Sequence, residues 1–476
     1  MKRKYSSIFV MFLIIATLLV VVRHAAAAQS QSVEGFWAGT LDAGAIKLRL
    51  VMKFSRTPDG KLKGLLDSVD QGASDIPMDV VTFQDGALHV EIKNLGAMYD
   101  GKLSADGTQI TGEFMQGGAK LPLDLKRIEK VSDVAIKRPQ TPKKPYPYDE
   151  IEVTYQNQRD KITFGATLTV PRGAGPFPAV VLITGSGLED RNEALFGHQP
   201  FLVLADYLTR RGIAVLRADD RGIGGTTKGL PNDTSENYAG DALAGVAFLK
   251  TRKEINPKQI GLVGHSEGGM IGPMAAVRSN DVAFIVLMAG PGIVGDKLLL
   301  MQNGLISAAE CQSEVKESVA QSAKVLAIAK DEKDPAIAKQ KIEAEDAQLA
   351  AAARKKLEGQ LSASSTRINQ ILSPWFRFFL NYDPRPTLMK VHIPVLALNG
   401  EFDMQVPARE DLEAIEQALK DGGNRDYKIV LLPKLNHLFQ TSKTGSPSEY
   451  GAIEETIAPV ALETMAGWIV AHTTKN

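Results

Sequence analysis

Cysteine is almost absent from this sequence, since Cys311 is the only one among 476 residues. A single cysteine excludes an intrachain disulfide, and its internal position excludes a lipid-modified cysteine at a mature N-terminus. Its neighbours, SAAECQSE, offer neither a glycine-rich turn nor a histidine that would serve as a base. We therefore expect Cys311 to be an ordinary helix residue rather than a nucleophile.

The chain also lacks an excess of charge of either sign, because Lys and Arg together number 55 and so do Asp and Glu. This balance excludes the basic surface typical of nucleic-acid-binding proteins. A glycine-rich phosphate loop followed by Lys-Ser or Lys-Thr is missing too. With 44% hydrophobic and 23% charged residues, the composition is that of a soluble globular protein, and the length predicts two or three domains.

Long apolar runs are confined to the first thirty residues. Basic MKRKYSS precedes the run IFVMFLIIATLLVVV, which is followed by RHAAAAQS with its small residues in an A-x-A pattern. This order predicts a signal peptide over residues 1–28, cleaved after Ala28. The alternative is an uncleaved anchor, although the run is shorter than the ~20 residues of a membrane span. We expect an exported protein, periplasmic or secreted, with no stable membrane anchor after cleavage.

Two kinds of strand pattern follow one another along the mature chain. Residues 29–136 alternate apolar and polar positions between the turn signals PDG, QDG and ADG, which predicts a small antiparallel β domain. The Pro- and Lys-rich stretch 137–150 is typical of an extended linker. In residues 151–291 and 393–476, nearly continuous apolar strands alternate with helices, which predicts a mostly parallel sheet covered on both faces. Residues 292–392, rich in Ala, Lys, Glu and Gln, predict a helical insertion.

The stretch GLVGHSEGGM, residues 261–270, surrounds one serine with glycines. It lies between a predicted buried strand and a predicted helix, which is the setting of the nucleophile elbow G-x-S-x-G. Gly264 and Gly268 would let strand and helix pass close to the turn, leaving Ser266 at its tip. The backbone N–H of Glu267 would then face a developing oxyanion. The alternative, a glycine-rich turn with an ordinary serine, leaves the clustered glycines unexplained.

A nucleophilic serine needs a histidine base and an orienting carboxylate, which in this strand–turn–helix setting follow in the order Ser…Asp…His. Asp403 follows the next-to-last predicted strand in LNGEFDMQVP, with Glu401 as the competing carboxylate. His437 follows the last strand in LLPKLNHLF. Alternation along the strand turns His265 away from Ser266, into the core. His198, in FGHQPF, is a candidate for the mouth of the site or for packing at a helix start.

Further site residues are expected around this triad. The second oxyanion donor should be the backbone N–H of Ser186 or Gly187, in TGSG after a strand. Asp220 and Arg221 are expected to form an ion pair that shapes the floor of the site. The stretch SPWFRFFLNYDPRP ends the insertion and supplies the aromatic residues expected to wall an acyl pocket: Trp375, Phe376, Phe378, Phe379 and Tyr382.

GHSEGG, GEFDMQVP, LNH and DDRGIGG, in their order along residues 150–476, resemble the α/β-hydrolase superfamily. Within that superfamily, the chain more closely resembles exported bacterial two-domain esterases with an N-terminal β domain and a helical cap. The resemblance implies the α/β-hydrolase fold and hydrolysis of small carboxylic esters through an acyl-enzyme, with no metal and no cofactor. TGSG departs from the His-Gly loop of many members. We expect a serine carboxylesterase for short acyl chains.

Two other functions compete with this one, and the oligomeric state is not specified by the sequence. A serine peptidase of the prolyl-oligopeptidase or aminopeptidase type would share the elbow, but the β region of about 100 residues is too small for the propeller that such peptidases commonly carry. A non-catalytic binding protein on a hydrolase scaffold would usually have lost one triad residue, and all three are present.

Overall fold

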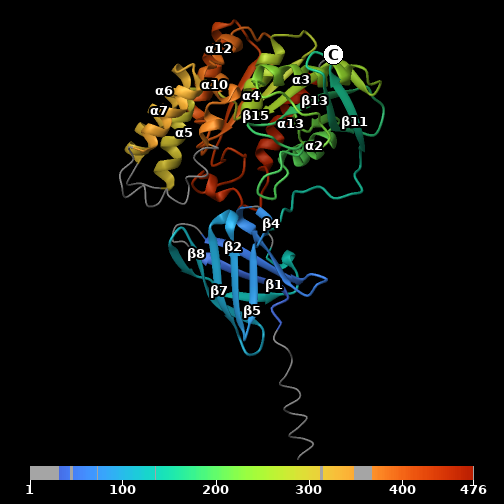
Figure 1. Ribbon diagram of the computed structural model, residues 1–476. Helices are drawn as coiled ribbons and strands as arrows, with labels where there is room; N and C mark the ends of the chain where they lie inside the picture. Colours follow the sequence, from blue (N-terminus) through green and yellow to red (C-terminus); the bar gives the residue numbers. More distant parts are fainter. Residues whose placement is uncertain are drawn as a thin grey trace, which may run out of the picture. The chain divides into compact units, whose positions relative to one another are not determined.

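The computed structural model describes residues 32–474 except 43–46, 72, 135, 311–314 and 348–366. The predicted signal peptide and Cys311 lie outside the described residues. The chain divides into two compact units (Figure 1). The first ends at residue 135 and leaves out residues 70–72, and the second holds residues 70–72 and 136–476.

The first unit is an antiparallel sheet, as the alternating pattern predicts. Its strands run in the order β4-β3-β2-β1-β10-β8-β7-β6-β5, and β9 pairs with β8. The bounds are β1 Gly35–Asp42, β2 Lys47–Arg56, β3 Leu62–Ser68, β4 Ala73–Pro77, β5 Val80–Gln84, β6 Ala87–Ile92, β7 Ala97–Leu103, β8 Gln109–Gln116, β9 Ala119–Pro122 and β10 Leu125–Ile128. Alternate residues such as Trp37, Val90 and Tyr99 form its buried core. The QDG signal is the two-residue turn between β5 and β6, where Asp85 and Gly86 both have positive φ.

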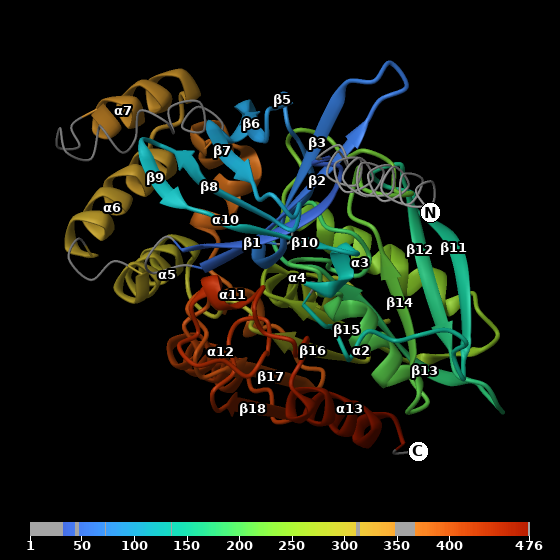
Figure 2. The same cartoon turned by 90° about the horizontal axis from the view of Figure 1, so that it is seen from below.

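The second unit is built on a mostly parallel sheet in the order β11-β12-β14-β13-β15-β16-β17-β18. The pairs β11–β12 and β12–β14 are antiparallel and the rest are parallel. The bounds are β11 Asp149–Asn157, β12 Ile162–Val170, β13 Phe177–Ile183, β14 Ala214–Ala218, β15 Ile255–His265, β16 Phe284–Met288, β17 Val395–Gly400 and β18 Tyr427–Leu432. In Figure 2, β11 and β12 lie at one end of the sheet and β17 and β18 at the other.

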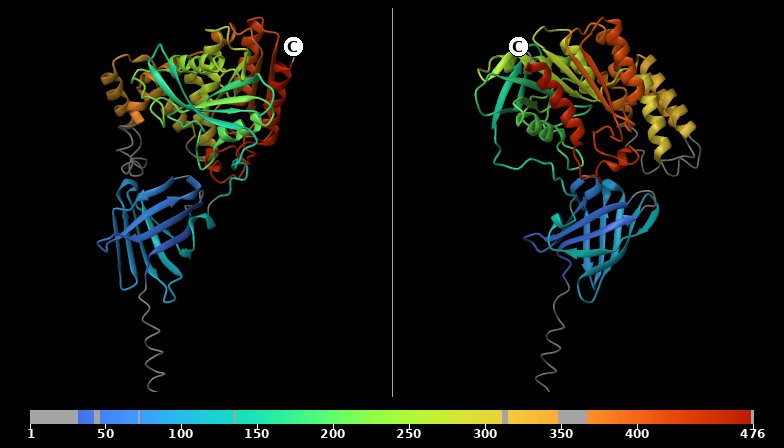
Figure 3. Two further views of the ribbon diagram at one scale, coloured as in Figure 1. Left: turned by 90° about the vertical axis from the view of Figure 1, so that its right-hand side faces the viewer. Right: turned by 180° about the vertical axis from the view of Figure 1, so that it is seen from behind.

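Helices cover both faces of this sheet. α2 (Pro200–Thr209) and α13 (Pro459–Thr473) pack on one face, where Figure 3 shows α13 in red. On the other face lie α3 (Ser235–Lys250), α4 (Glu267–Ala276) and α12 (Ala408–Asp421). Both faces of the central strands are therefore buried, which explains their continuous apolar sequences.

Further helices lie between β16 and β17. Their bounds are α5 Gly295–Glu310, α6 Val315–Asp331, α7 Pro335–Ala347, α10 Pro374–Asn381 and α11 Arg385–Leu388. α5, α6 and α7 lie side by side, and α10 packs against α5 and α6 (Figures 1 and 2). Within the described ranges, the helices of this protein fall short of the length and apolar character that a membrane span needs.

The predicted linker, residues 137–150, is not a free connection. The guanidinium of Arg138 donates to the backbone oxygens of Phe196, Gly451 and Ile453, each at 2.7 Å. Gln140 is bonded to the backbone of residues 456 and 457. Its Pro and Lys content gives an extended chain, but these polar side chains fasten that chain to the second unit.

Candidate active site

Ser266 sits on a sharp turn between β15 and α4. Its backbone has φ 52° and ψ −118°, a left-handed conformation that residues other than glycine rarely adopt. The neighbouring glycines explain how the chain reaches it. A Cβ on Gly264 would overlap the carbonyl oxygen of Gly268, and a Cβ on Gly268 would overlap that of Ile183. The sequence thus holds the strand, the helix and the neighbouring strand close enough to force this turn.

Ser266 opens into a pocket of about 480 Å³. Its walls come from the loop after β13, from the loops after β17 and β18, and from the helices between β16 and β17. The lining includes Gly185, Ser186, Glu189, Glu193, Leu195, Phe196, His265, Ser266, Pro291, Leu298, Leu299, Gln302, Trp375, Phe376, Phe379, Gln405, Val406, His437, Leu438, Pro447 and Tyr450. The position of Ser266 at a carboxyl edge of a parallel sheet is where α/β proteins place their ligand sites.

A buried histidine–aspartate pair lies in the same region. His437 Nδ1 and Asp403 Oδ2 are 2.8 Å apart, and both side chains are at least 95% buried. Asp403 Oδ1 accepts from the backbone N–H groups of Gln405 and Val406, which fixes the carboxylate. Glu401, the competing acid, instead accepts from the backbone of Lys434. The structure therefore brings Asp403, not Glu401, to His437.

The loop after β13 approaches Ser266 from the other side. Ser186 lines the same pocket as Ser266. Gly187 has φ +133° and lines a different, smaller cavity. The two residues considered as oxyanion donors therefore line different spaces, and Ser186 shares its pocket with Ser266.

Glu267, the residue after Ser266, has a buried carboxyl group that accepts hydrogen bonds from two distant parts of the chain. Its Oε1 accepts from the hydroxyl of Ser235 at 2.6 Å and from the indole N–H of Trp375 at 2.8 Å. Burial raises the pKa of its carboxyl. The elbow motif predicts a role only for the backbone N–H of Glu267, because no spacing in the sequence indicates that Ser235 and Trp375 meet here.

His265 is buried, as expected, but it is not an apolar core residue. Its Nδ1 lies 2.8 Å from Glu193 Oε1, and its Nε2 lies 3.0 Å from the backbone oxygen of His437. Burial alone would lower the pKa of His265. The charge of Glu193 and the hydrogen bond to it outweigh burial and raise that pKa to about 9.

The predicted aromatic wall divides into two groups. Trp375, Phe376 and Phe379 line the pocket. Phe378 and Tyr382 stack on each other, with ring centroids 5.4 Å apart, and pack against the core of the sheet. Phe379 belongs to both environments, because it lines the pocket and is also buried in the core of the sheet.

His198 belongs to the buried interior before α2 rather than to the pocket mouth. Its ring contacts the hydroxyl of Thr456 at 2.9 Å and the side-chain amide of Gln440 at 2.9 Å. Burial, with a smaller effect of the charge on Arg138, lowers the pKa of His198 to about 4. Its role is packing at the start of the helix, one of the two alternatives expected.

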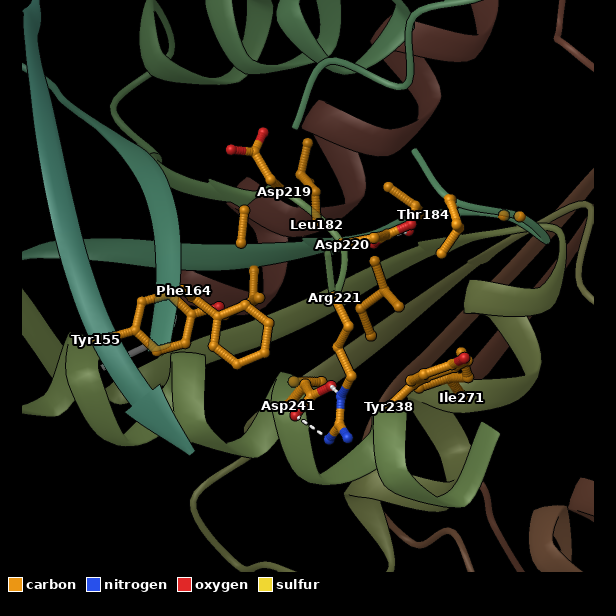
Figure 4. A pocket seen from close by; sticks show the side chains of 17 residues that line it. Tyr155, Phe164, Leu182, Thr184, Asp219, Asp220, Arg221, Tyr238, Asp241 and Ile271 are labelled. Carbon is orange, nitrogen blue, oxygen red and sulfur yellow. Dashed lines mark hydrogen bonds and ion pairs between the residues drawn. The ribbon is translucent and has the colours of Figure 1, made fainter. Parts of the chain in front are cut away.

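The prediction that Asp220 and Arg221 form an ion pair is wrong. Arg221 pairs with Asp160, Asp233 and Asp241, whereas Asp220 accepts from the Thr184 hydroxyl and the Glu189 N–H. Figure 4 shows the two side chains pointing apart, with Arg221 directed at Asp241. They flank a cavity of about 70 Å³ next to the loop after β13.

One acid on the pocket wall has an unsatisfied atom. Glu189 Oε2 is buried and has no hydrogen-bond partner among the described residues. Burial, followed by the charge of nearby Glu193, raises the pKa of Glu189 to about 8. Its carboxyl is therefore mostly protonated at neutral pH, and a cation in the pocket would favour its ionisation.

The sheet order, the strained serine turn and the histidine–aspartate pair define an α/β-hydrolase. The sequence pattern of the X-Pro dipeptidyl-peptidase (S15 family) matches residues 160–437. The chain belongs to this family.

The chain is similar to the esterase EstD of Thermotoga maritima, with 27% identity over 337 residues, which is 68% of each protein. Among solved structures, it aligns with the α/β-hydrolase GrgF from a Penicillium species (18% identity, 68% and 99% of the two chains, TM-score 0.42). It also aligns with an esterase of Pyrococcus furiosus (14% identity, 71% and 97%, TM-score 0.41).

Proposed function

We propose that this protein is a serine carboxylesterase in which Ser266, His437 and Asp403 form the catalytic triad. The observation that carries the proposal is the buried His437–Asp403 hydrogen bond of 2.8 Å beside the pocket that Ser266 lines. The similarity to a named esterase over 68% of the chain supports it. We propose further that residues 292–392 act as a cap, because Leu298, Trp375 and Phe376 supply pocket wall.

The geometry supports a two-step reaction. The Ser266 hydroxyl attacks the ester carbonyl while His437 Nε2 takes its proton, and the Nδ1–H of His437 remains bonded to Asp403. The tetrahedral oxyanion accepts hydrogen bonds from the backbone N–H groups of Glu267 and Ser186. Its collapse expels the alcohol, which receives the proton from His437. Water then attacks the acyl-enzyme by the same route and releases the acid and free Ser266.

A peptidase is the second candidate, and one specific observation favours it. Glu189 presents a buried, unpartnered carboxyl oxygen on the pocket wall, close enough to Glu193 to feel its charge. Such a group suits the amino terminus of a peptide substrate, because an ammonium would supply the missing donor. The match to a family named for X-Pro dipeptidyl peptidases supports the same candidate.

Labelling with an organophosphate, followed by peptide mass spectrometry, tests the nucleophile. We expect one adduct, on Ser266, and none in Ser266→Ala. The kcat/KM values for p-nitrophenyl esters and X-Pro p-nitroanilides then decide the reaction. A higher value for an anilide than for every ester assigns the peptidase function. An adduct on a different residue contradicts the triad, and a labelled Ser266 without turnover of either class favours a binding protein.

A further inference from the structure

Both ring nitrogens of His265 meet hydrogen-bond acceptors. Nδ1 faces the carboxylate oxygen Oε1 of Glu193 at 2.8 Å, and Nε2 faces the carbonyl oxygen of His437 at 3.0 Å. A neutral imidazole carries a single N–H and leaves one of these contacts without a proton. The imidazolium form donates to both acceptors at once, and the facing carboxylate balances its charge.

The pair joins two loops that carry the proposed catalytic groups. Glu193 Oε1 also accepts from the backbone N–H of Gly185 at 3.0 Å, and Gly185 directly precedes Ser186. The carbonyl that receives the second bond belongs to His437 itself. His265 in turn directly precedes Ser266. One chain of hydrogen bonds therefore links the oxyanion loop, the nucleophile turn and the loop of the base.

Its surroundings make this link stiff. The His265 and Glu193 side chains are 7% and 4% exposed. The His265 ring packs against the His437 ring, with centroids 4.9 Å apart. Hydrogen bonds between charged groups are stronger than neutral ones, and burial keeps water from replacing them.

We propose that the buried His265–Glu193 ion pair positions Ser186 and His437 around Ser266 and thereby sets the rate of the chemical step. Both members are positioning residues, since they act through Gly185 and through the His437 backbone. The inference rests on the proposed hydrolase function. It also gives a role to the histidine of GHSEGG that packing alone does not require.

The pair predicts a pH dependence with a definite sign. The titratable groups around His265 are Glu193, Glu189 and His437. Asp403 is hydrogen-bonded to Nδ1 of His437. Because the pKa of His265 is raised to about 9, the imidazolium is present at neutral pH and is lost as the pH rises through that value. Above it, one of the two loop contacts breaks, so kcat should fall.

Two amide substitutions separate the two contacts. The side-chain nitrogen of His265→Asn takes the place of Nδ1 and keeps the bond to Glu193, whereas that of His265→Gln takes the place of Nε2 and keeps the bond to His437. Neither side chain titrates. Each variant should lower kcat about tenfold or more at pH 7.5 with little change in KM, because sub-ångström displacement of catalytic groups slows the chemistry. In neither variant should kcat fall near pH 9.

The experiment is a kcat–pH profile on p-nitrophenyl esters between pH 6 and 10.5, with the uncatalysed rate subtracted, for wild type and both variants. Thermal unfolding at each pH restricts the comparison to folded enzyme. A fall near pH 9 that persists in both variants, or wild-type kcat in both, overturns the inference. Ser266→Ala is the control for the function: if it retains turnover, the hydrolase proposal itself fails.

A second measurement does not need activity. In Ser266→Ala labelled with ¹⁵N-histidine, the His265 N–H signals, assigned by their loss in the His265→Asn double variant, should show two protonated nitrogens at pH 7.5. Loss of one proton should follow near pH 9. A single protonated nitrogen at pH 7.5 contradicts the ion pair, whatever the kinetics show.

Discussion

Ser266 holds a left-handed backbone conformation that costs roughly 1–3 kcal/mol for a residue with a side chain. The fold maintains this conformation because the strand and helix pack closely at Gly264 and Gly268, where any side chain would overlap the neighbouring backbone. The strain is thus fixed by neighbours that do no chemistry. A hydroxyl presented at the tip of such a turn is accessible to a substrate and cannot withdraw into the helix.

Removing the triad groups one at a time tests their roles. Ser266→Ala and His437→Ala should each lower kcat by about 10⁶-fold, and Asp403→Ala somewhat less, as in other serine hydrolases. The double variant of Ser266 and His437 should be no slower than either single one, because the groups act together. Glu401→Ala is the matched control, since Glu401 accepts from a backbone N–H rather than from His437. A near wild-type rate in Asp403→Ala would remove it from the triad.

Asp411 is a buried acid whose effect on stability depends on pH. Its Oδ1 accepts from the backbone N–H groups of Gly292 and Ile293, while Oδ2 is buried without a partner among the described residues. Burial raises the pKa of Asp411 to about 7. The unfolded chain ionises near pH 4, so the carboxylate destabilises the fold progressively between pH 4 and 7 and fully above pH 7.

Asp411→Asn removes that titration but keeps an acceptor oxygen. Its free energy of unfolding, relative to wild type, should rise between pH 4 and 8 by about 1.4 kcal/mol for each unit of pKa shift removed. Urea unfolding at several pH values measures the difference. A pH-independent gap between the two proteins would mean that Asp411 titrates normally.

At the scale of elements, a polar contact joins α10 to the turn that carries Ser266. The Trp375 indole N–H donates to Glu267, which follows Ser266, while the Trp375 ring walls the pocket. The helices between β16 and β17 are therefore connected to the proposed oxyanion donor as well as to the substrate space. Substitutions in α10 should therefore alter which substrates the protein prefers.

The aromatic residues of α10 and its C-cap include both residues that line the pocket and residues that do not, so one segment provides the test variants and their controls. Alanine at Trp375, Phe376 or Phe379 should enlarge the pocket and shift the preferred acyl chain to greater length. Phe378→Ala and Tyr382→Ala should leave the preference unchanged, because these rings do not belong to the pocket lining. For the wild type we expect a preference for about two to six carbons, with a gain of about 0.8 kcal/mol per methylene until the pocket is full. The measurement is kcat/KM across acyl lengths from two to twelve carbons.

Two outcomes would contradict the pocket assignment. One is a wild-type profile that still rises at twelve carbons. The other is a preference that moves equally in all five variants, which would indicate a general loss of packing rather than a pocket wall.

Periodicity predicts the strands and helices of both units. The chain order of Ser266, Asp403 and His437 predicts the Asp403–His437 pair and its place beside the pocket that Ser266 lines. What the sequence could not supply are contacts between loops distant in the chain. Glu193 and His265 are separated by 72 positions and no spacing rule connects them, so the sequence does not predict their ion pair. Asp220 and Arg221 are adjacent in the sequence, and adjacency suggests a pairing, but three acids distant in the chain, Asp160, Asp233 and Asp241, take the guanidinium instead.

At the scale of the whole molecule, the N-terminus remains a prediction of the sequence. The basic, apolar and small-residue order of the first 28 residues indicates removal by signal peptidase. We expect the exported protein to begin at or near Gln29. N-terminal sequencing of the periplasmic and medium fractions measures this. Recovery of a chain starting at Met1 from membranes would indicate an anchor instead.

The attachment of residues 138–148 determines where the chain can be cut. Arg138 and Gln140 clasp the loop that follows β18, and Tyr148 donates to Asp206 on α2 at 2.9 Å. A protease is therefore expected to find this proline-rich stretch protected despite its composition. A fragment of the second unit that begins at residue 150 would remove these donors from four backbone oxygens, those of Phe196, Gly451, Ile453 and Ile457. A fragment that begins at residue 136 keeps them.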